Sequence, residues 1–397
     1  MTTQLAPGTR FEGRRAQARV EAQTVETFVD GLVGETLHER RVKSLALATV
    51  GVLHSASLAI HMIGRGLAAA RGTSAKHGTK QVDRLLSNGG IELWRLFELW
   101  VRFVVGVRKE IIVALDWTEF DADKQATICL YMITRHGRAT PLLWKTVSKK
   151  TLAGKRNEYE YDVVGHLHDA LPPDVKITLL ADRGFGDQKM YAFLDTFGWD
   201  YVIRFRECIH VTDANGTTKP AADWLESTGR AKMLKGVSVT DDKAPVPAVV
   251  VVHDKRMKES WCLATSRVQD GAAAVIKLYG RRFTIEETFR DTKDVHFGMG
   301  LSATHIGSNA RRDRLLFLGA LAYALLVLLG AAGERCELDR TLKASTTKRR
   351  TLSLFKQGCF WYDAIPAMRD DRFEMLMAAY DACVREHAVF EEAFGLL

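Results

Sequence analysis

Four polar side chains of different chemistry lie between Tyr279 and Lys293, at spacings that a single helix would bring together. The stretch YGRRFTIEETFRDTK has no Pro, and its strong helix formers predict one helix. At about 100° per residue, Tyr279, Arg282, Glu286 and Lys293 fall within about a 60° sector of that helix. The two cations of such a face could hold phosphate groups, and its carboxylate could bind a hard metal ion.

A plainer interpretation of this face is a solvated surface held by pairs at helical spacing. Arg282 and Glu286 are four residues apart and would form such a pair on any exposed helix. An apolar stripe beside the polar sector would attach the helix to a core. The stripe consists of Leu278, Ile285 and Phe289. The choice between the two interpretations depends on acidic residues elsewhere in the chain.

Two aspartates each follow an apolar run that is typical of a buried strand. Ile111–Leu115 ends on Asp116, and Val175–Ala181 ends on Asp182. A single Asp after a strand is more often a turn former or a helix cap than a ligand. The order of elements through residue 206 is three strands, a helix, a strand, a helix and a strand. This is the order of an RNase H-like core, in which the first and fourth strands are neighbours, so the two carboxylates would converge.

The spacing Tyr-x2-Arg-x3-Glu-x6-Lys resembles the signature helix of transposases of the IS4 type, at all four positions. That family also carries Asp-x-Thr after its first strand and Asp-Arg after its fourth. This chain has Asp116-Trp117-Thr118 and Asp182-Arg183 at those places. The resemblance implies a metal-dependent DDE transposase. Asp116, Asp182 and Glu286 would be its catalytic residues and would bind two Mg²⁺ ions, for which Mn²⁺ can substitute.

The implied activity is cleavage of transposon ends and transfer of the 3′ ends to target DNA by two-metal-ion phosphoryl transfer, through a hairpin intermediate. Tyr279, Arg282 and Lys293 would contact DNA, as would Arg183. The implied partners are transposon-end DNA and target DNA, with a homodimer in the DNA complex and no membrane. The expected location is the bacterial cytoplasm, in association with the nucleoid.

Two further regions carry expected DNA contacts. Trp261 begins a Trp-x-Leu-x-Thr-Ser run that the family places on a strand near the DNA end, where the indole receives or displaces a flipped base. Core packing is the alternative for this residue. Lys80 and Arg84 lie in a short basic helix that ends in Leu-Leu-x-Asn, as in the N-terminal domain of the family. They would contact the DNA backbone, although an exposed basic helix needs no ligand.

The expected fold is α/β, with an RNase H-like core that consists of a mixed five-stranded sheet with helices. A β-rich insertion interrupts the core, and helical regions flank it. The expected divisions are a DNA-binding region at 1–105, the core at 106–206 and 261–333, the insertion at 207–260, and a C-terminal region at 334–397 with a possible dimerisation role.

The composition of the chain excludes fewer classes of function than its motifs do. The formal net charge of +8 is compatible with an anionic partner. The six cysteines are scattered without a CxxC pair, which argues against a zinc site or a disulfide framework. The N-terminus has no apolar run typical of a signal peptide. Leu315–Ala332 is apolar throughout and reaches the lower length limit of a membrane span, but a buried core helix has the same pattern.

Two other functions share much of this pattern. A domesticated or inactive copy would bind DNA ends without cutting them. An RNase H-like nuclease of another role, such as repair, would share the three carboxylates. The Tyr279–Lys293 signature and the β-rich insertion argue against the nuclease.

Overall fold

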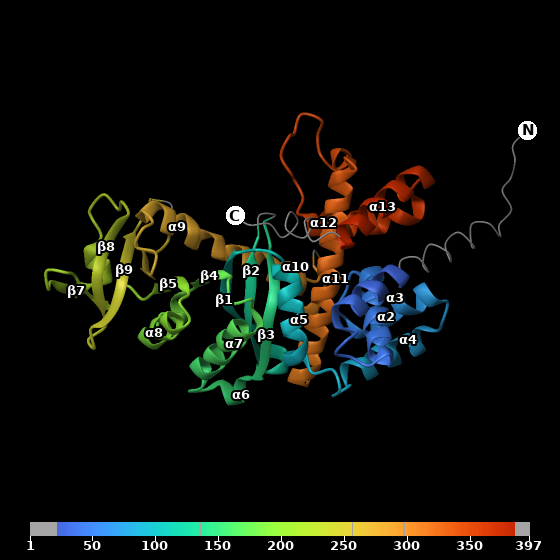
Figure 1. Cartoon of the computed structure of the whole chain (residues 1–397), viewed down its shortest axis with the longest axis horizontal. Helices are drawn as coiled ribbons and strands as arrows, with labels where there is room; N and C mark the ends of the chain where they lie inside the picture. Colours follow the sequence, from blue (N-terminus) through green and yellow to red (C-terminus); the bar gives the residue numbers. More distant parts are fainter. Residues whose placement is uncertain (1–21, 135–136, 256, 297, 386–397) are drawn as a thin grey trace, which may run out of the picture.

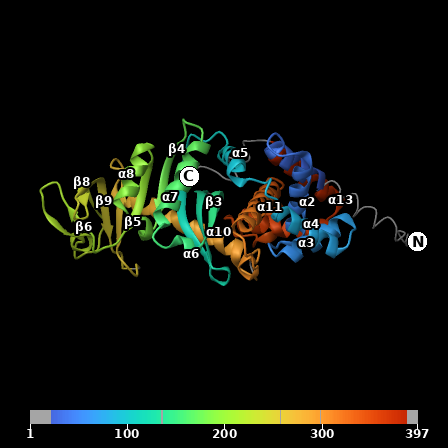
Figure 2. The ribbon, with the colours of Figure 1, turned by 90° about the horizontal axis from the view of Figure 1, so that it is seen from below.

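A computed structural model describes the chain except for residues 1–21, 135–136, 256, 297 and 386–397. The molecule is elongated. Strands β6 to β9 lie at one end, a helix-covered sheet lies in the middle, and a helical region lies at the other end (Figures 1 and 2). The fold is mixed α/β.

One mixed sheet of ten strands runs through the described part of the chain, in the order β3-β2-β1-β4-β5-β10-β9-β8-β6-β7. Its strands are β1 (Glu110–Phe120), β2 (Gln125–Ile133), β3 (Ala139–Ser148), β4 (Lys176–Ala181), β5 (Asp200–Phe205), β6 (His210–Thr212), β7 (Thr218–Pro220), β8 (Lys232–Val239), β9 (Ala244–Val252) and β10 (Trp261–Thr265). Neighbours β1 and β4, and β4 and β5, are parallel, and the other pairs are antiparallel. The prediction that the first and fourth strands are neighbours is confirmed.

Helices cover both faces of the central strands, which explains their continuous apolar sequences. Every residue of β2 is buried. One face of the sheet packs against α7 (Arg156–Ala170), and α7 also contacts α5 (Leu93–Val105). Helix α10 (Thr284–Lys293) contacts β1, β2 and β3. Helices α6 (Lys149–Leu152), α8 (Gln188–Thr196) and α9 (Ala272–Gly280) complete this part of the molecule.

The N-terminal helical region is packed around close helix contacts. The sequence pattern predicts a helix at 16–37; residues 22–33 are helical, and residues 16–21 lie outside the described residues. Then follow α2 (Glu39–Ser55), α3 (Ile60–Arg71) and α4 (Ala75–Leu86). A Cβ added at Gly78 of α4 would lie 2.1 Å from the carbonyl oxygen of Gly64 in α3. Glycine is therefore required for this approach of the two helices.

The long apolar segment is the core helix α11 (Asn309–Arg335). It is long and apolar enough to cross a membrane, but 94% of its most apolar window is buried inside the protein. Its neighbours α12 (Leu354–Ala364) and α13 (Asp370–Arg385) follow in the chain. A Cβ at Gly358 of α12 would lie 1.8 Å from the carbonyl oxygen of Leu326, so α12 crosses α11 in direct backbone contact. The interpretation of 315–332 as a core helix is confirmed.

Two predicted element boundaries are wrong. The first strand does not end before Asp116. It continues to Phe120, because β2 pairs with it as far as Phe120↔Gln125. The stretch Tyr279–Lys293 is not one helix, since a 3-10 turn at Arg281–Phe283, named η4, separates α9 from α10. The sequence His136-Gly137-Arg138 also predicts a tight turn between the second and third strands, and part of it lies outside the described residues.

The region between β5 and β10 is β-rich, as predicted. Strand β10 pairs with β5 on one side and with β9 on the other. The strands of residues 210–252 thereby extend the central sheet. A 3-10 turn, η3 (Ala221–Trp224), lies among them.

Candidate active site

Strand register brings Asp116 and Asp182 to the same level of the sheet. The parallel pairing of β1 with β4 ends at Leu115↔Ala181, and the two aspartates are the next residues on these strands. Asp116 remains in β1, opposite Cys129 of β2, and its Oδ1 accepts the backbone N–H of Trp117 at 2.8 Å. The side chain of Asp182 caps the turn after β4, since its Oδ1 accepts the N–H of Gly184 at 2.8 Å.

Arg282 joins Asp116 to Glu286. Its Nη1 lies 3.1 Å from Asp116 Oδ2, and its Nη2 lies 3.0 Å from Glu286 Oε1. The pair expected from helical spacing is therefore present. However, Arg282 is only 6% exposed and also bonds a carboxylate of the central sheet. The solvated-surface interpretation of this face is wrong.

The acidic side chains affect one another electrostatically. Burial raises the pKa of Asp116 to about 6; Arg282 opposes that rise, while Asp182 and Glu286 add to it. Arg282 bonds two of these three carboxylates, and the excess negative charge of the three suits a divalent cation. Their oxygens are the hard ligands that Mg²⁺ prefers. Within the described ranges, no three His, Cys, Asp or Glu side chains are already grouped as a metal site.

Lys293 lies on the same helix as Glu286 but contacts the end of β1. Its Nζ donates to Thr118 Oγ1 at 3.0 Å and to the carbonyl oxygen of Glu119 at 2.8 Å. The ammonium also lies 4.7 Å from the centre of the Phe120 ring. Burial lowers the pKa of Lys293. The lysine therefore ties α10 to the strand that carries Asp116.

Two aromatic rings, of Tyr279 and Phe283, lie beside Arg282, and the ring of Trp261 packs against both. The ring of Trp261, at the start of β10, is 4.9 Å from the buried Tyr279 and 6.1 Å from Phe283. Phe283 is 42% exposed, and its ring centre lies 4.9 Å from the guanidinium of Arg282. Trp261 is only partly buried. We name Trp261, Tyr279 and Phe283 the aromatic cluster.

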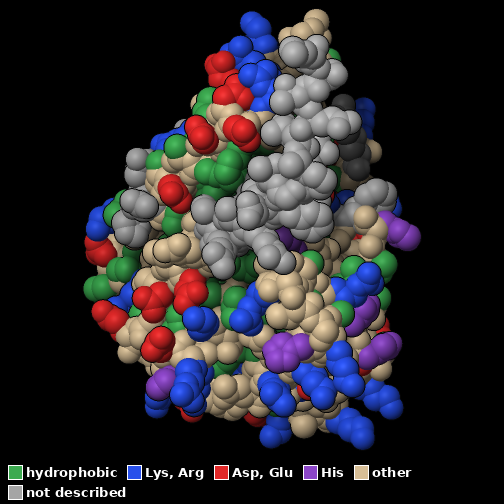
Figure 3. Space-filling view, turned by 90° about the vertical axis from the view of Figure 1, so that its right-hand side faces the viewer, with side chains coloured by type: hydrophobic (Ala, Val, Ile, Leu, Met, Phe, Trp, Pro, Cys, Tyr) green, Lys and Arg blue, Asp and Glu red, His purple; other side chains and the backbone are tan. Residues whose placement is uncertain are grey.

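The remaining predicted DNA contacts lie apart from this cluster or at its edge. Arg183 is exposed and pairs with Glu259 at 3.2 Å, which Arg204 also contacts at 2.8 Å. Lys80 and Arg84 are exposed on α4, within the helical end of the molecule (Figure 1). Figure 3 shows Lys, Arg and His side chains gathered on the lower part of that end. The exposed basic residues of α3 and α4 are His61, Arg65, Arg71, Lys76, His77, Lys80 and Arg84.

Sequence reasoning missed Glu160, a buried acid on α7. Its Oε1 accepts the indole N–H of Trp117 at 2.8 Å, on the face of β1 opposite to Arg282. Burial raises the pKa of Glu160, and the charge of Asp182 contributes to that rise. A signal was present, because Glu160 occupies the apolar stripe of its helix with Val163, Val164 and Leu167. Phe283 was also missed.

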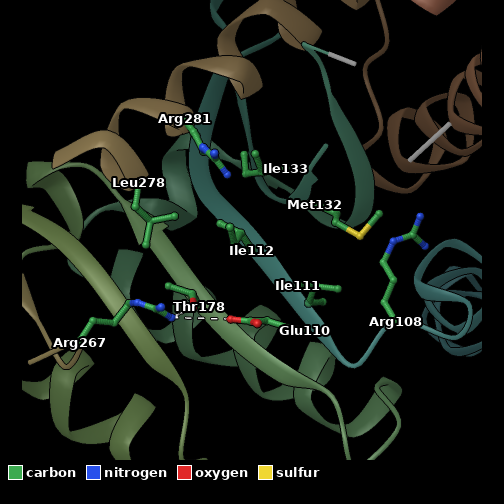
Figure 4. A pocket seen from close by; sticks show the side chains of 10 residues that line it. All are labelled: Arg108, Glu110, Ile111, Ile112, Met132, Ile133, Thr178, Arg267, Leu278 and Arg281. Carbon is green, nitrogen blue, oxygen red and sulfur yellow. Dashed lines mark hydrogen bonds and ion pairs between the residues drawn. The ribbon is translucent and has the colours of Figure 1, made fainter. Parts of the chain in front are cut away.

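A cavity of about 260 Å³ lies near the start of β1 (Figure 4). Arg281 borders it, whereas the next residue, Arg282, bonds to the acidic side chains. Arg267 lies 3.8 Å from Glu110 and donates to Thr178 at 3.1 Å. The lining residues are Arg108, Glu110, Ile111, Ile112, Met132, Ile133, Thr178, Arg267, Leu278 and Arg281.

The family model of the transposase DDE domain matches residues 108–325, more than half of the chain. This chain belongs to the transposase DDE domain family. The matched range contains Asp116, Asp182 and Glu286, together with Trp261. Comparison with curated proteins gave no match. Members of this family act on transposon DNA and generally use divalent metal ions.

Proposed function

We propose that the protein is a DNA transposase of the IS4 type with an RNase H-like core. It would cut transposon ends and transfer their 3′ ends to target DNA. The proposal is supported by the register of β1 and β4, which puts Asp116 and Asp182 directly after the last paired residues of the two strands, and by the bonds of Arg282 to both Asp116 and Glu286, in a chain of the DDE family.

The three carboxylates would hold two Mg²⁺ ions, or Mn²⁺ in their place. When bound, the ions would activate the attacking oxygen and stabilise the leaving oxygen of an in-line displacement at phosphorus. Backbone N–H groups fix one oxygen of each aspartate in advance. Asp116 accepts from Trp117, and Asp182 accepts from Gly184 in the turn after β4. Lys293 keeps α10 at a constant position against β1, which sets Glu286 relative to Asp116.

The aromatic cluster fits a base that has left the DNA stack. Flipping a base costs a few kcal/mol, and stacking on an aromatic side chain returns about 1–3 kcal/mol. Phe283 lies beside Arg282, which bonds two of the carboxylates, and Trp261 packs next to Phe283. Arg282 and Arg183 would hold phosphate there. Cleavage through a hairpin requires such a distortion, and we propose that route for this protein.

Helix α4 would contact the DNA backbone. Lys76, Lys80 and Arg84 are all exposed and are spaced by four residues, so they share one side of the helix. Helices α3 and α4 are joined by the short turn Gly72–Ser74, and DNA-binding helix-turn-helix motifs with such a turn contact DNA through their second helix. We propose residues 1–105 as the end-binding region and 334–397 as a region that supports a homodimer in the DNA complex. Strand β10, which begins at Trp261 after the 207–260 insertion, would approach the DNA end.

The test is cleavage of the DNA that flanks the gene. The protein, Mg²⁺ and a labelled duplex of each flank should give a nick at the element boundary and then a hairpin. Asp182→Asn should bind the same duplex and leave it intact. Asp195→Asn, an exposed change on α8, is the matched control and should cut normally. Binding without any cleavage by the unmodified protein would instead support the alternative of an inactive end-binding copy.

A further inference from the structure

Arg282 holds the carboxylate oxygens that a metal ion would need. Both ends of its guanidinium are engaged, one at 3.1 Å from Asp116 and the other at 3.0 Å from Glu286. The side chain is 7% exposed, and among the described residues its buried Nε has no acceptor. The guanidinium is therefore the charge partner of these two acids, at the place where a metal ion would otherwise neutralise them.

A divalent ion and this guanidinium cannot share the two acids at low cost. Arginine does not lose its proton in proteins, so it can relieve the repulsion only by moving. A phosphate offers it the same forked geometry that a carboxylate does, with two parallel N–H···O bonds. The partly exposed Phe283, 4.9 Å from the guanidinium, borders the outer side of Arg282, where a DNA strand would lie.

We propose that Arg282 closes the acidic site to divalent cations until a DNA phosphate draws the guanidinium away. Metal binding is thereby coupled to DNA binding. The coupling keeps the protein from cutting before an end is in place. It is also reciprocal, so metal must tighten DNA binding by the same factor. This inference rests on the proposed function of Asp116 and Glu286.

The experiment measures Mn²⁺ binding to the full chain, by electron paramagnetic resonance of free Mn²⁺, without DNA and with a duplex of the element end. Without DNA, Arg282→Ala and Arg282→Gln should bind Mn²⁺ at least about tenfold more tightly than the unmodified protein. Arg281→Ala is the matched control, because the neighbouring Arg281 lines the cavity, and it should not change the affinity. The duplex should tighten Mn²⁺ binding to the unmodified protein by a similar factor. It should change the Mn²⁺ affinity of the Arg282 variants little.

Equal or weaker Mn²⁺ binding by both Arg282 variants, with normal melting temperatures, would overturn the coupling. If the variants do not fold, the unmodified protein alone tests the proposal. An Mn²⁺ affinity that is the same with and without the duplex would contradict it. Asp116→Asn combined with Arg282→Gln should lose the gained affinity. If no form binds Mn²⁺ with or without DNA, the proposed metal ligands fail together with the coupling. If all forms bind it equally, the coupling alone fails.

Discussion

Arg282 bonds a carboxylate 166 positions earlier in the chain as well as one a single turn away. Such a residue cannot be assigned from local spacing, because the nearby pair with Glu286 accounts for its position on a helix. The burial of Arg282 gives the missing information. A guanidinium on a residue that is 6% exposed must be paired, and it must therefore affect the binding of any other cation to the same carboxylates.

At Trp261 we expect a change to Ala to slow hairpin formation far more than the first nick. Nicking needs no flipped base, whereas the hairpin does. The measurement is a gel assay on a duplex with 2-aminopurine near the cleaved phosphate, which also reports unstacking by fluorescence. Trp261→Phe keeps a ring against Tyr279 and should retain most of the hairpin rate. Equal slowing of both steps by the Ala variant, with an unchanged fluorescence rise, would assign Trp261 to core packing.

Local sequence patterns predicted much of the candidate site, and the rest of it depends on tertiary packing. Asp116 and Asp182 follow apolar runs, and the strand order brings those runs together. The bonds of Lys293 to the end of β1 were not predictable, because β1 continues past Asp116 and no local pattern reports that. The phosphate contacts of Tyr279, Arg282 and Lys293 remain predictions, as does the catalytic role of the carboxylates.

At the scale of elements, Asp313 of α11 lies against β3 and should make stability depend on pH. Its Oδ1 accepts the N–H of Thr146 at 3.0 Å, yet burial raises its pKa to about 7. Because the pKa is raised on folding, this contribution to stability is complete below about pH 4 and is lost as the pH rises through 7. Asp313→Asn should therefore raise the unfolding free energy at pH 8, on the order of 1–3 kcal/mol, and change it little near pH 4.

Chemical denaturation across pH 4 to 8 measures this difference. The same change at Asp223, an exposed residue of the turn after β7, provides the control. A difference between Asp313→Asn and the unmodified protein that stays constant over the range would contradict the assignment to Asp313.

The contact between α3 and α4 should not tolerate a side chain at Gly78. Alanine there would place its Cβ 2.1 Å from the carbonyl oxygen of Gly64, so the helices must separate, at a cost of about 1–3 kcal/mol. Gly31 is also helical but has no atom within 4 Å of an added Cβ, so Gly31→Ala should be neutral or slightly stabilising. Thermal unfolding compares the two, and equal melting temperatures would show that the helix contact adapts freely.

Apolar runs predicted β1 to β5 and the core helix α11 because burial on all sides leaves a continuous sequence signal. The turn at Arg281–Phe283 gave no such signal. Arg281 and Phe283 have right-handed helical backbone angles, and the tighter hydrogen bonding of the turn distinguishes it from the helices on either side. The turn lies where Arg282 bonds to Asp116 of the sheet.

At the scale of the whole molecule, the basic face of α4 lies at the helical end, apart from the acidic site (Figures 1 and 2). Lys80→Ala and Arg84→Ala should each weaken binding of an end duplex and reduce the salt slope by about one unit. Lys176→Ala, an exposed change at the start of β4, should leave the slope unchanged. Binding isotherms at several salt concentrations measure this. An unchanged slope in both α4 variants would remove this helix from the DNA interface.

The single continuous sheet was the feature least accessible from the sequence. Local patterns mark the strands of 210–252, but only the pairing of β10 with β5, about sixty residues apart, joins them to the core. Pairing between distant strands leaves no local pattern. The proposed boundaries at 207 and 260 therefore delimit a segment of the sequence, but the strands of that segment belong to the same sheet as the core strands.

The most direct test of the account is the single-turnover cleavage rate of an end duplex by Asp116→Asn, Asp182→Asn and Glu286→Gln. Glu287→Gln serves as the control, because Glu287 is on the same helix and pairs with Arg290 instead. Each of the three site variants should lose at least about a thousandfold in rate while binding the duplex normally, and the control should stay within a few-fold of the unmodified protein. If any one of the three variants still cuts within tenfold of the unmodified rate, Asp116, Asp182 and Glu286 do not form one catalytic centre.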